Sequence, residues 1–142
     1  KYVAPVDGRV DQIRHESGET IVSIYLGITD VHSIRSPTVG QVTKTLRKSG
    51  KNYPAQLTTL AEKNNSLSYV YENEDVLTVY TGIFARRLVD DTSPPESVNK
   101  GQEVGFISFG SRCTVRIKNK NFDTLEVSEG DFIRSGESVV AN

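Results

Sequence analysis

Short apolar stretches with the alternation of β-strands recur along the chain, separated by Gly, Pro, Asn and Asp. No long segment follows the 3.6-residue period of an amphipathic helix. The best helix candidate is residues 54–65, where Pro54 would suit the first turn. The pattern predicts a mostly β protein, a compact barrel or sandwich of short strands with at most one or two short helices. Strands are expected within residues 1–5, 8–13, 20–28, 40–46, 66–72, 75–89, 104–110, 112–117 and 138–141.

Residues 105–115, GFISFGSRCTV, have the pattern of a strand with a Gly-Ser pair at its centre. Alternation places Ser111 on the apolar face with Ile107 and Cys113, and Arg112 on the other face. A glycine inside a strand marks a bulge or a close approach of backbone. Taken locally, the pattern therefore favours a bulge at Gly110 followed by a small buried hydroxyl.

Composition places the chain among ordinary globular domains. Its 142 residues are 36% hydrophobic and 25% charged, which fits one domain with a real core, residues 1–142. A net charge of −1 gives no bulk attraction to nucleic acid, so no nucleic-acid partner is expected. The single cysteine excludes an internal disulfide and suits a reducing compartment. Residues 47–54 and 90–102 are expected to be loops, the first of them basic.

No apolar run approaches the length of a membrane span. The chain has no methionine and begins KYVAPVDG in strand-like sequence, which indicates a trimmed chain or a fragment.

Three residues are candidates for chemistry: Asp7, His32 and Ser111. An acid, a histidine and a serine can form an activated nucleophile, with the histidine as base and the acid as its orienter. Each also has a structural alternative. Asp7 precedes Gly8 in a turn-like APVDGR, where Asp accepts local backbone hydrogen bonds and Gly supplies a positive φ. A lone histidine is more often structural than catalytic, and Ser111 could be a core hydroxyl. The residue types alone do not decide between these interpretations.

Five motifs occur in order along nearly the whole chain. They are APVDG, ITDVHSIRSPTVGQV, YTGIFARRLV, KGQEVGFISFGSRCTV and VSEGDFIRSGESVVA. The set resembles the phosphatidylserine decarboxylase proenzymes of the short type, and DVHSIRSP, FARRLV and FGSR are its most specific parts. Archaetidylserine decarboxylases share these motifs, so the resemblance leaves the lipid class open. Two of the motifs pair a turn glycine with valines, as in hybrid-barrel folds.

The resemblance implies self-cleavage of the bond between Gly110 and Ser111. The products would be a β chain, residues 1–110, and an α chain, residues 111–142, that begins with a pyruvoyl group derived from Ser111. Asp7 and His32 would form the processing triad with Ser111. The pyruvoyl cofactor would then form a Schiff base with the substrate amine and act as an electron sink while CO2 leaves. His32 is also the candidate acid for the final protonation. A carboxy-lyase of this kind is expected to need no metal.

The resemblance also suggests substrate-binding residues. Arg35 stands where longer members of the family carry a second histidine, and it could bind the substrate carboxylate or phosphate, or form a surface ion pair. Arg86 and Arg87 could contact the lipid phosphate or brace a strand end. The expected partners are a phospholipid and a membrane surface, with the basic stretch TLRKSGKNYP, residues 45–54, as the contact, on the cytoplasmic side. A homodimer is left open, and residues 71–75, YENED, carry Glu74 where the family's acidic element has Arg.

Two alternatives stay open at this point. The first is an uncleaved, non-enzymatic binding module of the same fold. The second is a phosphocarrier of the sugar-phosphotransferase type, because YVAPVDGRV followed by IYLGITDV looks like its glucose-specific domain. That chemistry needs a histidine at the end of this strand, where the chain has Tyr25 and Leu26.

Overall fold

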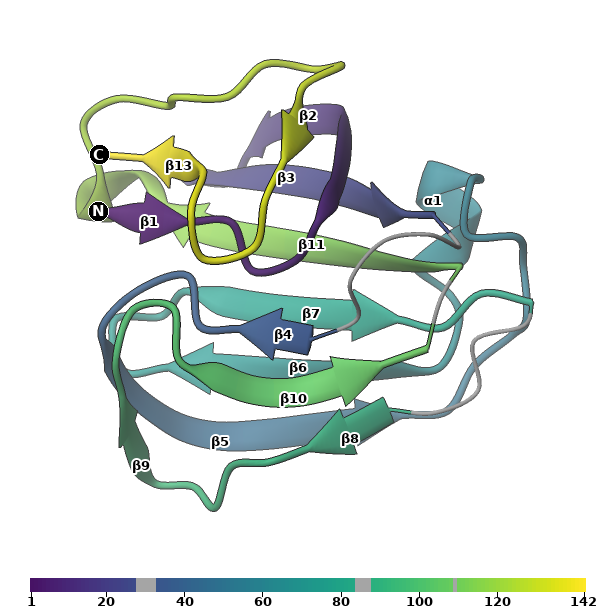
Figure 1. Ribbon diagram of the computed structural model, residues 1–142, viewed down its shortest axis with the longest axis horizontal. Coiled ribbons are helices and arrows are strands. Elements are labelled where there is room, and N and C mark those ends of the chain that lie inside the picture. The colour runs from purple at the N-terminus through teal and green to yellow at the C-terminus, as the bar shows by residue number, and fades with distance from the viewer. Residues whose placement is uncertain (28–32, 84–87, 109) are drawn as a thin grey trace.

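The computed structural model describes residues 1–27, 33–83, 88–108 and 110–142 (Figure 1). Strands dominate these residues, together with a short helix α1 (Thr58–Ala61) and a 3₁₀ turn η1 (Asn119–Asn121). The predicted mostly β class is confirmed. Of the two predicted architectures the chain adopts the sandwich, because the described strands form open sheets that pack face to face and do not close into a barrel.

The described strands form one large antiparallel sheet, a smaller sheet and a separate pair. In spatial order, the large sheet consists of β12 (Phe132–Ile133), β2 (Gly8–Glu16), β3 (Glu19–Leu26), β11 (Ser111–Lys118), β7 (Val76–Tyr80), β6 (Ser66–Tyr71), β5 (Gly40–Lys48) and β9 (Glu96–Val98). The smaller sheet is β4 (Ser33–Arg35), β10 (Glu103–Ile107) and β8 (Leu88–Asp90), and the pair is β1 (Tyr2–Val3) with β13 (Val139–Ala141).

The smaller sheet covers the half of the large sheet formed by β7, β6 and β5 (Figure 1). The two layers touch closely at Tyr69, whose hydroxyl donates a hydrogen bond of 3.0 Å to the carbonyl oxygen of Val104. Gly105 lies directly over this phenol, where any side chain would collide with it. The buried apolar residues of both layers form one core, which includes the side chains of Ile34, Ile107 and Val115.

The central strand β11 is buried on both faces. Cys113 and Val115 point into the core, and burial raises the pKa of the Cys113 thiol, which keeps it protonated. Arg112 and Thr114 on the opposite face are as fully buried, with exposures of 0% and 1%. An arginine in the interior needs an explanation, since a charged group is buried at low cost only when it is paired.

Three local predictions were wrong in detail. The helix begins at Thr58, so Pro54 is not in its first turn; its carbonyl instead accepts the N–H of Leu57 in a turn before the helix. The strand β5 continues to Lys48, into the expected basic loop. The expected loop at residues 90–102 contains β9, which forms because it pairs with the start of β5.

A buried carboxylate closes the end of the sandwich where β11 finishes. Asp75 is 3% exposed and accepts hydrogen bonds from the Tyr2 hydroxyl and from Asn73 Nδ2 at 3.0 Å. It also accepts from the backbone N–H of Lys118 at 2.8 Å and from Asn121 Nδ2 at 2.9 Å. Burial raises the pKa of the Tyr2 phenol, which therefore remains a donor to this carboxylate.

We predict that Asp75→Ala lowers the free energy of unfolding by about 3 kcal/mol, because it leaves buried donors without an acceptor. Urea unfolding followed by circular dichroism measures this loss. The control is Glu74→Gln at the neighbouring position, which removes the exposed pair with Lys120 and is expected to leave the urea midpoint unchanged. Equal effects of the two substitutions would contradict the stabilising role assigned to the buried Asp75 carboxylate.

Candidate active site

The bond between Gly110 and Ser111 lies where the chain crosses from one sheet to the other. β10 ends at Ile107 in the smaller sheet, and β11 begins at Ser111 in the large sheet (Figure 1). The predicted bulge is therefore wrong: the glycine occupies a break between two strands. Its φ of +68° lies in the left-handed region, which glycine adopts without steric cost. The junction requires glycine for this conformational reason.

Ser111 is the first residue of β11 and has an exposure of 0%, which confirms the predicted burial. Its hydroxyl donates a hydrogen bond of 2.9 Å to the carbonyl oxygen of Ser108. The hydroxyl oxygen is thus held on the side of the residues that precede the Gly110–Ser111 bond. A local bond of this kind from serine to a carbonyl three residues earlier competes with regular strand pairing and helps to end it.

Gly82, in the segment that follows β7, leaves the space that the carbonyl group of Gly110 occupies. A Cβ atom at position 82 would collide with the Gly110 carbonyl oxygen and would lie 3.2 Å from its carbonyl carbon. The same Cβ would lie 3.1 Å from the Cβ of Ala55. Sequence reasoning missed this residue. Its only signal was the glycine inside the motif YTGIFARRLV.

Arg112 follows Ser111 directly, and its guanidinium is enclosed by acceptors. Two parallel hydrogen bonds of 2.7 Å join it to the carboxylate of Asp11. It also donates to the carbonyl oxygen of Ala55, from Nε at 2.9 Å and from Nη2 at 2.7 Å, and to the hydroxyl of Ser23 at 2.8 Å. Sequence reasoning noted the motif FGSR but assigned no role to its arginine.

Asp7 lies in the turn before β2 and is half-buried. Its carboxylate accepts the backbone N–H of Ser135 at 2.6 Å, so it ties this turn to the C-terminal segment. It borders a cavity of about 200 Å³ together with Gly8, Phe132 and Arg134. The local-turn interpretation was wrong for Gly8: its φ is not positive, and glycine is required because a Cβ would collide with the carbonyl oxygen of Tyr25.

The register of the sheet relates Asp7 to Ser111. Arg9 and Arg112 both pair with Tyr25, from opposite sides of β3. The residues just before them, Gly8 and Ser111, therefore lie at the same end of β3, about 10 Å apart at the usual strand spacing. Among the described residues no hydrogen bond joins Asp7 to Ser111, and their predicted action together with His32 stays a prediction.

Arg35, at the end of β4, is also held by its surroundings. Its Nη1 donates a hydrogen bond of 2.8 Å to the carbonyl oxygen of Gly101, and its Cδ packs beside Gly136. In the register of β4 against β10, Arg35 lies opposite Glu103, at the end of β10 that is farther from Gly110. The contacts brace the backbone; the predicted role in substrate binding stays a prediction.

Three predicted site residues, His32, Arg86 and Arg87, lie outside the described residues. Their predicted roles stay predictions. Within the described part of the chain there is no group of three or more His, Cys, Asp or Glu residues suited to holding a metal.

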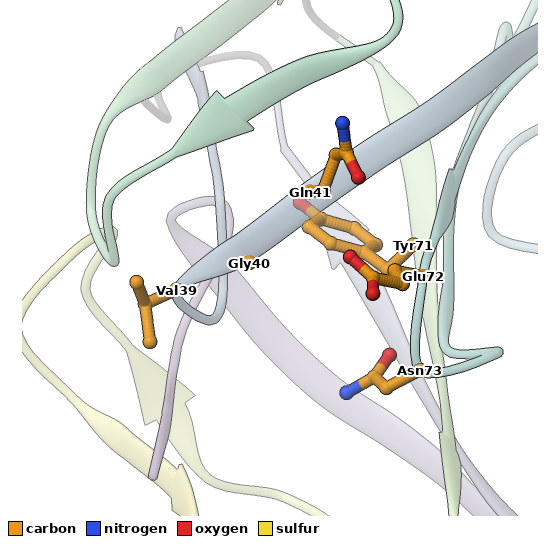
Figure 2. A pocket seen from close by; sticks show the side chains of 6 residues that line it. All are labelled: Val39, Gly40, Gln41, Tyr71, Glu72 and Asn73. Atoms are coloured by element: carbon orange, nitrogen blue, oxygen red, sulfur yellow. The ribbon is translucent and has the colours of Figure 1, made fainter.

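A separate cavity of about 290 Å³ is shown in Figure 2. The strand register places it at the opposite end of the large sheet from Ser111, because Tyr71 follows Val70, which lies in one row with Val76 and Arg116. Figure 2 shows Gln41 from β5 beside Tyr71, at the end of β6, and Glu72. Burial raises the pKa of Tyr71 to about 12, and its hydroxyl lies 2.7 Å from that of Ser36. This cavity does not belong to the Gly110–Ser111 junction.

Comparison with known proteins gives a match along nearly the whole chain. The model of the phosphatidylserine decarboxylase family matches residues 1–141. The chain belongs to this family. A phosphatidylserine decarboxylase proenzyme of Desulfotalea psychrophila is 30% identical over 97% of this chain and 69% of its own length. One of Neorickettsia sennetsu is 34% identical over 98% and 67%. A candidate archaetidylserine decarboxylase proenzyme of Methanopyrus kandleri is 29% identical over 97% and 72%.

Membership of the family confirms the resemblance found in the sequence and the expected class of decarboxylase enzyme. The matched range contains Asp7, Gly110, Ser111 and Arg112. A match of this extent argues against the phosphocarrier alternative.

We predict that Gly110→Ala destabilises the fold by about 1–2 kcal/mol, because alanine is strained at a φ of +68°. The measurement is urea unfolding in a Ser111→Ala background, which lacks the predicted nucleophile. Gly40→Ala is the control, because a Cβ there has nothing nearer than 3.9 Å and its φ is not positive. An unchanged midpoint for Gly110→Ala would show that the junction does not hold the left-handed conformation.

Proposed function

We propose that this chain is the proenzyme of a pyruvoyl-dependent decarboxylase that converts phosphatidylserine or archaetidylserine to the ethanolamine phospholipid and CO2. The main structural support for this proposal is the Gly110–Ser111 junction. There a buried serine follows a glycine with left-handed backbone at a break between two sheets. The names of its relatives support both the reaction and an inactive precursor.

Self-cleavage begins when the Ser111 hydroxyl turns from the Ser108 carbonyl and attacks the carbonyl carbon of Gly110. The Oγ–C bond forms, the C–N bond breaks, and the hydroxyl proton passes to the freed amine. A base then removes the Cα proton of residue 111, the Cβ–Oγ bond breaks, and Gly110 leaves as a carboxylate. The dehydroalanine left behind takes up water and releases ammonia, which gives the pyruvoyl group.

Asp7 and His32 serve this first step in the proposal. His32 accepts the proton of Ser111, and the Asp7 carboxylate orients the imidazole and stabilises its positive charge. The support is the family's motif together with the position of Asp7 at the same end of β3 as Ser111. Burial of Ser111 excludes water, which protects the ester from simple hydrolysis.

The residues of the junction suit a pyruvoyl group, because the new terminus would be the first, buried residue of a central strand. Its carbonyl would supply an electrophile for the substrate amine and a sink for the electron pair released with CO2. The chain contributes a dry, rigid site at the start of β11. His32 delivers the final proton, and Arg35, Arg86 and Arg87 are the candidates for binding the headgroup.

The membrane contact is proposed at the end of the sandwich that holds the junction. Lys48, Ser66, Tyr80 and Arg112 pair in one row across β5, β6, β7 and β11, so the exposed Lys48 lies at the same end of the sheet as Ser111. Lys51 is also exposed close by. Leu57 and Leu60 of the α1 region are 44% and 38% exposed. Basic and apolar side chains together suit an anionic lipid surface on the cytoplasmic side.

Among the described residues, none of the helices is long and apolar enough to cross a membrane.

Assembly into a homodimer is a further part of the proposal, and analytical ultracentrifugation tests it.

We predict that the purified chain splits between Gly110 and Ser111 on incubation at neutral pH. Intact-mass measurement is expected to give residues 1–110 and a second chain lighter by one ammonia than a serine-headed peptide 111–142. The second chain is expected to react with a carbonyl reagent, and the processed protein to release CO2 from phosphatidylserine vesicles.

Ser111→Ala is the control and is expected to keep a single mass. A wild-type chain that stays whole for days would overturn the proposal and leave the uncleaved binding module. Cleavage without carbonyl reactivity would overturn the pyruvoyl assignment alone.

We predict that Lys48→Glu/Lys51→Glu weakens sedimentation with phosphatidylserine vesicles about tenfold or more, since each basic residue near an anionic surface contributes about 1 kcal/mol. The matched control is Lys118→Glu/Lys120→Glu, which makes the same change in charge at the other end of β11. If the two double variants bind equally well, the membrane contact lies elsewhere.

A further inference from the structure

We propose that Arg112 is a positioning residue for the Gly110–Ser111 bond, and that Asp11, Ala55 and Gly82 complete the support of this bond. The inference rests on the proposed self-cleavage and extends it to residues that touch neither the substrate nor the nucleophilic oxygen. We refer to these four residues as the junction clamp.

Arg112 fixes the serine side of the bond. Its five N–H donors are matched by five hydrogen bonds, to Asp11 twice, to the carbonyl oxygen of Ala55 twice and to Ser23 once. A guanidinium held in this way cannot rotate or shift without losing several charge-assisted bonds inside the protein. Because Arg112 directly follows Ser111, the backbone at the nucleophile is held with it.

The position of Asp11 comes from an irregularity in β2. The register of β2 against β3 shifts between Val10 and Gln12, so Asp11 is an extra residue in its strand. Such bulges redirect a side chain that regular pairing would place elsewhere. The side chain of Asp11 is 16% exposed, and its two carboxylate oxygens both accept hydrogen bonds from Arg112.

Gly82 fixes the other side of the bond. The Gly110 carbonyl rests where a side chain at position 82 would be, so the carbonyl cannot turn toward this segment. Ala55 joins the two halves of the clamp, because its carbonyl oxygen binds Arg112 while its Cβ borders Gly82. The backbone is therefore held on both sides of the Gly110–Ser111 peptide bond.

This arrangement has two consequences for the reaction. Before cleavage, a fixed peptide plane limits the attacking hydroxyl to a narrow range of approaches, and a displacement of about 1 Å can slow such a step about 10²-fold. After cleavage, Arg112 belongs to residues 111–142, while Asp11, Ser23 and Ala55 belong to residues 1–110. The same clamp then holds the new terminus in place across two separate chains.

The test follows cleavage in time after cell-free synthesis, with leucine as the label because the chain has no methionine. Arg112→Lys keeps the charge but loses the planar fork, and we expect cleavage at least tenfold slower. Arg116→Lys makes the same change on the same strand, at a partly exposed pair with Glu19, and should cleave within twofold of wild type. A folded Arg112→Lys chain that cleaves at the wild-type rate would overturn the inference.

Hydroxylamine separates the two chemical steps, because it cuts an ester but not a peptide bond under mild neutral conditions. If the clamp serves the first attack, hydroxylamine does not restore cleavage of Arg112→Lys. Fast release by hydroxylamine would show that the ester forms normally and that the clamp does not position the attack.

The second pair of variants addresses the carbonyl side. Gly82→Ala is expected to slow cleavage at least tenfold, because its Cβ displaces the Gly110 carbonyl. Gly40→Ala, with no neighbour nearer than 3.9 Å, is expected to have no effect. Equal rates for the two alanine variants would remove Gly82 from the clamp.

A third measurement does not depend on cleavage. In a Ser111→Ala background, Arg112→Lys is expected to speed hydrogen exchange at the amides of residues 110–113 at least tenfold more than Arg116→Lys does. Equal exchange in a cooperatively folded protein would overturn the positioning role even if the wild-type chain never cleaves. A wild-type chain that fails to cleave, with the exchange result as expected, would overturn the proposed function and leave the clamp as a structural element.

Discussion

A charged guanidinium in the protein interior is the constraint around which the junction is built. Arg112 has an exposure of 0%, and burial of an unpaired charge would cost far more than a domain of this size can offset. Its acceptors come from β2, β3 and the segment before α1. The β2–β3 hairpin, the segment before α1 and β11 therefore meet at one point, beside the Gly110–Ser111 bond. Loss of any one of them would leave the others with unmatched polar groups.

The placement of the bond between two sheets explains how one chain could become two without losing its fold. β11 pairs along its length with β3 and β7, both of which belong to residues 1–110. Gly110 lies before the first paired residue of β11 and takes no part in this pairing. A cut there removes one covalent link but leaves the central strand of the large sheet in register. Gly110 adopts a left-handed conformation where the chain passes between the two sheets. Any other residue at this position would strain the backbone.

The C-terminal segment contacts two of the candidate residues. The backbone N–H of Ser135 binds Asp7, and Gly136 packs on Arg35. The motif VSEGDFIRSGESVVA thus supports two candidate residues that are near the start of the chain. After cleavage these contacts would join residues 111–142 to residues 1–110, as the Arg112 contacts do. The candidate site therefore combines residues from motifs near both ends of the chain.

Short-range sequence patterns predicted part of the fold and of the candidate site. Alternation predicted the β class and the burial of Ser111, and the ordered motifs predicted the family, because both depend on residues close together in sequence. The helix was located but its bounds were not, because it comprises only Thr58–Ala61 of the expected residues 54–65. Nothing local shows that the turn at Pro54 ends before Thr58. Only the tertiary structure decided that Gly110 lies at a break between sheets, that Gly82 faces its carbonyl and that Arg112 meets Asp11 and Ala55. Those contacts join residues far apart in the chain, and their partners are set by sheet packing and strand register, which no local pattern of residues contains.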